Sequence, residues 1–114
     1  MDPEIRAALE RELRELALDF AAKLPARLEE IRRAWQQTEH AGWTGESFEA
    51  LYRNCHSLAG AGGTFGFDDV GSAARTLTDW LKHVRDRPAE RDGAAGADML
   101  DQLEKTVAAA ARRA

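Results

Sequence analysis

Residues 56–67 read HSLAGAGGTFGF, a histidine followed by a run of very small side chains. Five of the seven positions after His56 are glycine or alanine, and three of these glycines fall within one helical turn. Glycine inside a helix costs about 0.5–1 kcal/mol relative to alanine. Helix stability therefore does not explain the run, and we expect another backbone or another protein to come close to it. Gly66 is a natural residue for ending the helix in the left-handed conformation.

His56 lies on the flank of this helix and not on its buried face. On a wheel of about 100° per residue the apolar positions gather on one side. They are Phe48, Leu51, Cys55, Leu58, Gly62 and Phe65. His56 lies roughly 120° from their centre, so we expect its imidazole to be exposed. Gly60 and Gly63 share that flank and leave room for a partner, whereas Gly62 suits close packing of a neighbouring helix. The alternative is an ordinary surface histidine beside glycines that serve packing only.

Helical periodicity also dominates the first third of the chain. One apolar stripe with steps of three and four covers residues 5–35. Asp2 followed by Pro3 fits the start of a helix. Pro25 removes a backbone donor within the stripe and predicts a kink or a break there. Residues 38–45 read as a loop.

The remaining chain predicts further helices and no strands. A third helix is expected to open near Asp68 as its N-cap, and residues 85–96 form a polar connection. The last helix is expected to begin near Asp98. No run of alternating β-branched residues is present. We predict one all-α domain over residues 1–114, an antiparallel four-helix bundle with an N-terminal helical extension kinked or broken near Pro25.

Composition narrows the function classes. The chain has 114 residues and a net charge of −4, which argues against a nucleic-acid partner. No apolar run approaches the roughly 20 residues that span a bilayer, and no signal peptide is recognised, so we expect no membrane partner. The single cysteine, Cys55, cannot form an internal disulfide, and a reducing cytoplasmic location is expected.

A metal site and a conventional active site are both disfavoured. His40, His56, His83 and Cys55 show no spacing typical of metal ligands. Cys55 falls on the apolar stripe while His56 does not, so the two neighbours face different ways. The glycine run lies within a helix and follows no strand, unlike a phosphate-binding loop.

The segment from His56 to Phe67 resembles the signature of histidine phosphotransfer (HPt) domains, which read roughly H-x-L-K-G-x-x-G-x-x-G. Its TFGF ending is most similar to the phosphotransfer module of chemotaxis-type histidine kinases. The resemblance covers about residues 10–110, and its specificity rests on residues 51–81.

The resemblance implies a histidine phosphocarrier, not an enzyme. His56 would take a phosphoryl group on Nε2 and exchange it with an aspartate of a response-regulator receiver domain. A histidine kinase would be a further partner. No cofactor is expected on this chain, because Mg²⁺ would sit on the partner. The expected docking residues are Tyr52, Arg53, Ala59, Gly60, Gly63 and Phe67.

Two positions depart from the family pattern. Ala59 stands where the family usually has a lysine, which would favour the phosphorylated form. Thr78 stands where a Glu or Gln often orients the histidine ring, and its hydroxyl is the candidate replacement. The adjacent Asp79 is expected to point elsewhere. The alternative function is therefore a degenerate bundle that docks to a receiver or a kinase without carrying phosphate. Whether the chain is a monomer or a dimer stays open at this point.

Overall fold

Helices build the whole architecture. The computed structural model describes residues 1–113. Its elements are α1 (Pro3–Ala41), α2 (Gly45–Thr64), α3 (Asp68–Asp86), the short 3-10 helix η1 (Pro88–Glu90) and α4 (Gly93–Arg113). No strand occurs within residues 1–113, and the four α-helices pack against one another. The predicted all-α four-helix fold is confirmed.

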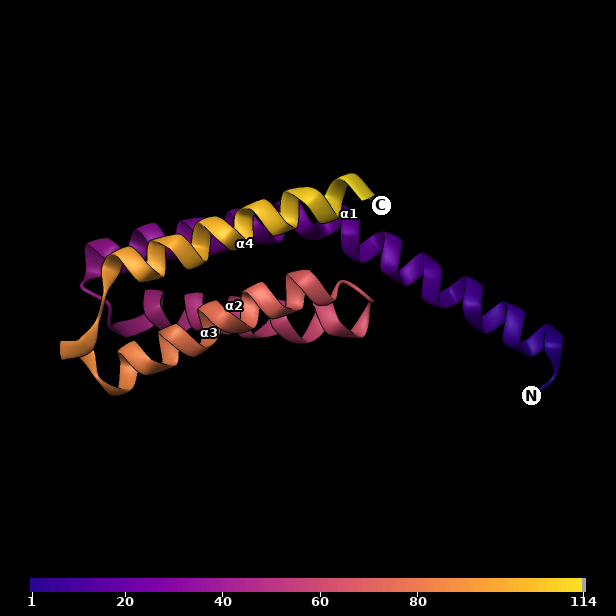
Figure 1. Cartoon of the computed structure of the whole chain (residues 1–114), viewed down its shortest axis with the longest axis horizontal. Coiled ribbons are helices and arrows are strands. Elements are labelled where there is room, and N and C mark those ends of the chain that lie inside the picture. Colours follow the sequence, from indigo (N-terminus) through magenta and orange to yellow (C-terminus); the bar gives the residue numbers. More distant parts are fainter. Residues whose placement is uncertain (114) are drawn as a thin grey trace.

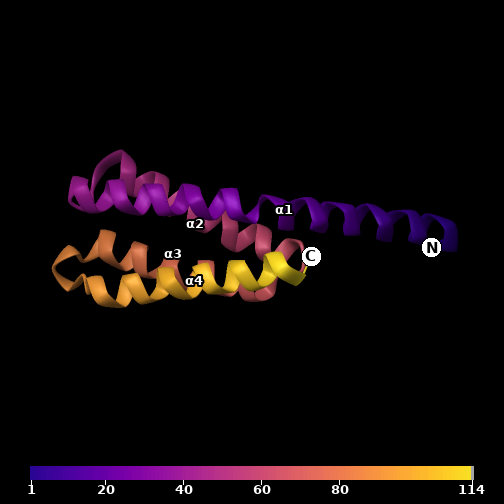
Figure 2. The same ribbon diagram turned by 90° about the horizontal axis from the view of Figure 1, so that it is seen from above.

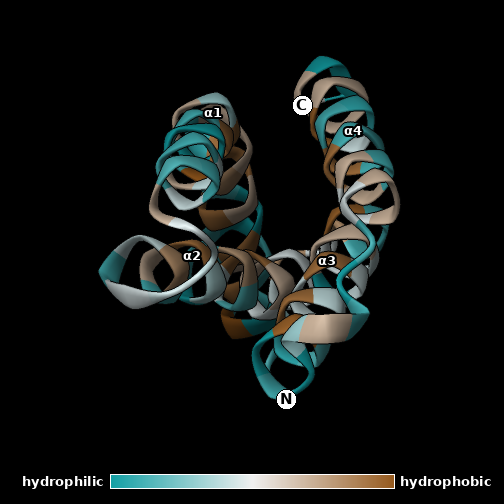
Figure 3. Cartoon of the chain, turned by 90° about the vertical axis from the view of Figure 1, so that its left-hand side faces the viewer, coloured by the Kyte–Doolittle hydropathy of each residue, from teal (hydrophilic) through white to brown (hydrophobic). Residues whose placement is uncertain are grey.

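The α-helices form a closed ring of antiparallel neighbours. α2 packs between α1 and α3, α3 packs against α4, and α4 returns to α1. The chain reverses direction at each connection (Figure 1), and an end-on view shows the four helices around a shared interior (Figure 3). Short connections between neighbours are typical of an up-down-up-down bundle.

The N-terminal part of α1 projects beyond the bundle. Two perpendicular views show it extending past the ends of the other helices (Figures 1 and 2). Its apolar side chains are in solvent, with Ile5 60% exposed and Leu13 55% exposed. From Phe20 onward the same stripe is buried in the core. The single stripe of the sequence therefore has two environments, and its first half does not help to close the bundle.

Pro25 lies inside a continuous α1, so of the two predicted alternatives the break does not occur. Proline lacks the N–H that the Ala21 carbonyl would accept, and its ring crowds that carbonyl. Such a site is a usual cause of helix bending. Figure 1 shows α1 changing direction where its projecting part leaves the bundle.

The two ends of α1 are capped by different means. The Asp2 carboxylate accepts a hydrogen bond from the Glu4 N–H at 2.7 Å, and Pro3 occupies the first turn, as the sequence predicts. At the other end the helix continues to Ala41, so residues 38–41 are helical and the predicted loop was too long. Gly42 ends the helix in the left-handed conformation, with φ 85°.

Two later boundaries also differ from the prediction. Gly66 adopts φ 84°, as expected, but Asp68 is the first residue of α3 and not its cap. α4 begins at Gly93 and not near Asp98. The reason is Asp92, whose carboxylate accepts hydrogen bonds from the N–H groups of Ala94 at 3.1 Å and Ala95 at 3.2 Å.

The core draws on all four helices. Its largest fully buried apolar side chains include Leu24, Ile31, Leu51, Leu58, Leu77, Leu81 and Leu103. At the end of the bundle where α1 meets α2, three indole rings form a cluster. The Trp35 ring lies 5.0 Å from Trp43 and 5.9 Å from Trp80, measured between ring centroids. This cluster holds the α1–α2 connection against α3, next to the start of α2.

Candidate functional site

His56 stands in the middle of α2 with its imidazole exposed. Its neighbour Cys55 and the nearby Leu58 are fully buried, which fixes the rotation of α2 against the core. The position on the helical wheel predicted this exposure from the sequence. Among the hydrogen bonds and ion pairs of residues 1–113, none involves the His56 ring. The ring nitrogens are therefore open to a reagent from outside.

Tyr52 lies one helical turn before His56, and the rings of the two side chains are nearly parallel. The two ring centroids are 6.0 Å apart and the ring planes differ by 5°. The guanidinium of Arg85, from α3, covers the Tyr52 ring at 4.8 Å from its centroid. These contacts restrict the Tyr52 side chain. Tyr52 in turn restricts the conformations that the His56 side chain can adopt.

The three clustered glycines have two different roles. A Cβ atom on Gly62 would lie 2.7 Å from the backbone nitrogen of Gly71, so α2 and α3 touch through bare backbone there. A Cβ on Gly60 or Gly63 would meet nothing within 4 Å. The inner glycine therefore serves packing, and the two outer glycines leave the surface beside His56 open.

A hollow of about 300 Å³ opens between α2 and α3 beside His56. Its lining is Tyr52, His56, Ala59, Gly60, Arg75, Thr78, Asp79 and Lys82. The α3 side of this hollow carries two cations and one carboxylate. Sequence reasoning singled out neither Arg75 nor Lys82. The sequence feature that could have identified them is their spacing. Arg75 and Lys82 are seven residues apart, which puts both on the face of α3 that also holds Thr78.

Thr78 lines the hollow, but its hydroxyl is already engaged. The side chain is 5% exposed, and the hydroxyl donates to the Ala74 carbonyl at 2.7 Å. Its role in orienting the His56 ring stays a prediction, because no hydrogen bond joins the two among residues 1–113. Asp79, which we expected to point elsewhere, lines the same hollow. Ala59 is 5% exposed, so it forms part of the floor and offers a partner little surface.

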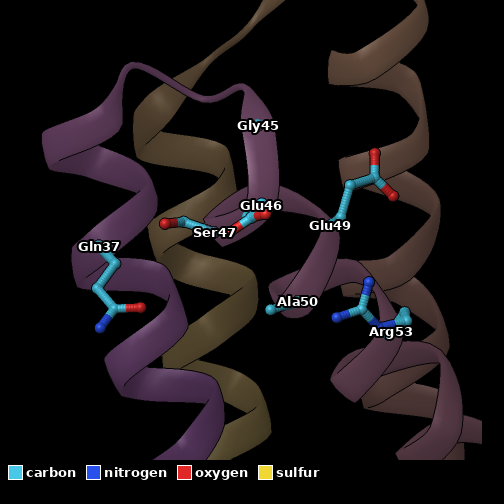
Figure 4. A pocket seen from close by; sticks show the side chains of 7 residues that line it. All are labelled: Gln37, Gly45, Glu46, Ser47, Glu49, Ala50 and Arg53. Atoms are coloured by element: carbon cyan, nitrogen blue, oxygen red, sulfur yellow. The ribbon is translucent and has the colours of Figure 1, made fainter.

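Arg53 and Phe67 lie away from the hollow beside His56. Arg53 belongs to a larger hollow of about 690 Å³ at the start of α2, where Gln37 of α1 lies across from the first turns of α2 (Figure 4). That hollow is lined mainly by polar side chains, and no hydrogen bond within residues 1–113 joins Ser47 to the carboxylate of Glu46 or Glu49. Phe67 is half-buried at the far end of α2, with its ring 5.5 Å from that of Phe20. The docking roles of both residues stay predictions.

Cys55 contributes no chemistry to the site. It is fully buried, and burial raises the pKa of its thiol to about 12. Within residues 1–113 no group of three or more His, Cys, Asp or Glu side chains is arranged to hold a metal ion. In the same part of the chain, no helix has the length and apolar character needed to cross a membrane.

An exposed histidine on the second helix of a four-helix bundle, beside a glycine-lined surface, agrees with the comparison to protein families. The Hpt domain model matches residues 15–112. The chain belongs to the Hpt domain family. Searches of curated proteins and of solved structures found no match. Hpt domains take part in histidine phosphotransfer within phosphorelays, where they interact with histidine kinases and receiver domains. Closeness of this Hpt domain to the chemotaxis-type modules stays a prediction.

Proposed function

We propose that this Hpt domain is a phosphocarrier that accepts a phosphoryl group on His56 and exchanges it with an aspartate of a receiver domain. The observation that carries the proposal is the exposed imidazole of His56 beside the open surface at Gly60 and Gly63. A receiver aspartate lies within an acidic pocket, so the histidine must enter that pocket. Side chains at the two glycines would hold the receiver away.

The transfer needs only one reactive group on this chain. A neutral imidazole has a nucleophilic nitrogen near pH 7. This nitrogen attacks phosphorus of the aspartyl phosphate, the phosphorus–oxygen bond breaks, and the electron pair leaves with the carboxylate. The ring proton passes to solvent, and the reverse reaction follows the same path. Any Mg²⁺ belongs to the partner, where it would neutralise the charge on the transferring oxygens.

The decisive experiment compares three histidine variants. His56→Gln is expected to abolish phosphorylation by a cognate kinase or a phosphorylated receiver, while helicity by circular dichroism is unchanged. His40→Gln and His83→Gln are matched controls, because both histidines are also exposed. The phosphoryl group should be labile in acid and stable in base. Phosphorylation that survives His56→Gln overturns the proposal.

Ala59, at the position where the family usually has a lysine, favours a second candidate function. In this alternative the domain docks to a partner without carrying phosphate. Incubation with a receiver charged by acetyl phosphate separates the two. Loss of phosphate from the receiver and its appearance on this chain support the phosphocarrier. Complex formation with no transfer, across receivers that each transfer to a control Hpt domain, supports docking alone.

A further inference from the structure

This Hpt domain lacks the usual lysine near its histidine, and no side chain on α2 replaces it within the hollow. Ala59 at that position is buried and uncharged. The remaining α2 members of the hollow are Tyr52, His56 and Gly60, none of which carries a permanent positive charge. A phosphoryl group on His56 would bring about −1.5 to −2 charge at pH 7. Within the hollow, any cation that offsets this charge must therefore come from another helix.

The opposite wall of the hollow provides such cations. Arg75 and Lys82 of α3 both line it, with Asp79 between them in the sequence. Both cations are exposed, and among the ion pairs of residues 1–113 none involves either of them. Arg85 also lies on α3, but its guanidinium already covers Tyr52. Two unpaired cations and one carboxylate therefore face the same space as the imidazole.

We propose that the hollow between α2 and α3 is the binding site for the phosphoryl group, with Arg75 and Lys82 as its cationic ligands in place of the missing lysine. This inference rests on His56 being the phosphoacceptor. The two residues are two helical turns apart on one face of α3, so they can approach the phosphoryl oxygens from either side. Asp79 acts in the opposite sense, because its carboxylate repels a phosphoryl group.

The strength of this effect is limited by solvent. Charges at exposed sites are screened by water and salt, so we expect each cation to change the stability of the phosphorylated form by roughly two- to fivefold. The effect should shrink at high ionic strength, with a Debye length of only about 3 Å at 1 M salt. A purely structural role of these side chains would not produce that salt dependence.

The test uses phosphoramidate, which needs no protein partner. A ring nitrogen of His56 attacks phosphorus, the phosphorus–nitrogen bond of the donor breaks, and the leaving nitrogen takes up the ring proton and departs as ammonia. Phosphorus-31 NMR then follows the phosphohistidine signal, its lifetime, and its titration with pH. The variants are Arg75→Gln, Lys82→Gln, the double variant, Lys82→Arg and Asp79→Asn.

We expect the double variant to shorten the lifetime of the phosphohistidine. It should also raise the apparent pKa of the phosphoryl group, because the cations that stabilise the dianion have been removed. Lys82→Arg should keep the native values, and Asp79→Asn should shift both quantities the other way. Lys105→Gln is the matched control, because Lys105 lies on α4 and pairs with Asp101 at 3.0 Å. Wild-type values in the double variant at low salt would overturn this inference alone. Each variant also carries His40→Gln and His83→Gln, because phosphoramidate can react with those two exposed imidazoles as well. In that background, a chain with His56 intact that gains no phosphohistidine, or one that still gains it after His56→Gln, would overturn both this inference and the proposed function.

Discussion

Gly62 of α2 and Gly71 of α3 meet backbone to backbone. A Cβ on Gly62 would lie 2.7 Å from the Gly71 nitrogen and 2.9 Å from its Cα, distances that require one helix to move. A Cβ on Gly71 would in turn lie 3.0 Å from the Ala59 carbonyl oxygen. This crossing lies one to two turns beyond His56. It sets the distance between α2 and α3, and therefore the width of the hollow beside that histidine.

The first prediction follows from this crossing. Gly62→Ala should destabilise the fold by about 1–3 kcal/mol, because backbone cannot yield as a flexible side chain can. Gly60→Ala is the matched control in the same helix, and it should be neutral or stabilising by up to about 1 kcal/mol. Urea unfolding of both variants measures the difference. Equal stability of the two variants would contradict the packing role given to Gly62.

The second prediction concerns the open edge of α2. Gly63→Glu should reduce phosphotransfer with a receiver roughly tenfold or more through steric and charge repulsion. The thermal unfolding temperature should change little, because a side chain there meets nothing within 4 Å. Gly63→Ala serves as the control for loss of glycine alone. Rapid-quench transfer assays measure the rate, and an unaffected Gly63→Glu variant would place the docking surface elsewhere.

The third prediction concerns Cys55, whose thiol pKa is raised to about 12 by burial. At pH 8 the native thiol should react with iodoacetamide about a thousandfold more slowly than the thiol of the unfolded chain, from the loss of thiolate alone. Mass spectrometry after timed labelling, with and without denaturant, checks this. Fast labelling of the folded protein would show that Cys55 is accessible.

The fourth prediction concerns the ion pair that links the end of α4 to the start of α3. The Arg113 guanidinium donates to both carboxylate oxygens of Asp69, at 2.8 and 3.1 Å. These hydrogen bonds hold the Asp69 pKa below its ordinary value. The folded-state pKa is depressed, so the pair stabilises the fold above the ordinary carboxyl pKa of about 3.9. That stabilisation is lost as the pH falls through the depressed value.

Arg113→Gln should therefore lower stability slightly at pH 7, and the difference from wild type should vanish in strong acid. Both groups are substantially exposed, at 53% and 43%, so the effect is small and is reduced by salt. Thermal unfolding from pH 2 to pH 7 measures it. A stability difference between wild type and Arg113→Gln that grows as the pH falls would contradict this prediction.

The fifth prediction concerns the projecting part of α1. Residues 1–16 are all exposed. Deletion of residues 1–14 should shift the thermal unfolding temperature by at most a few degrees, as expected for solvent-exposed segments. Deletion of residues 1–24 should cause a much larger loss, because it also removes the buried Phe20 and Leu24. Calorimetry distinguishes the two. A large loss on the shorter deletion would show that the projecting turns stabilise the bundle.

Local patterns determined much of this protein. The period of the apolar residues identified the helices and placed His56 on an exposed flank, because rotation about a helix axis follows directly from spacing. Asp2, Pro3 and Gly66 marked helix ends through backbone preferences that act over a few residues. The start of α4 was missed because Asp92 and Asp98 offer the same capping chemistry, and their sequence context does not rank them.

Only the tertiary structure decided which surfaces meet. The contact of Gly62 with Gly71 and the gathering of Arg75, Asp79 and Lys82 beside His56 depend on how α2 and α3 cross. The two halves of the α1 stripe have the same apolar pattern, yet only the half beyond Phe20 has helices to cover it. Burial is a property of neighbours in space, and a pattern along one helix does not specify those neighbours.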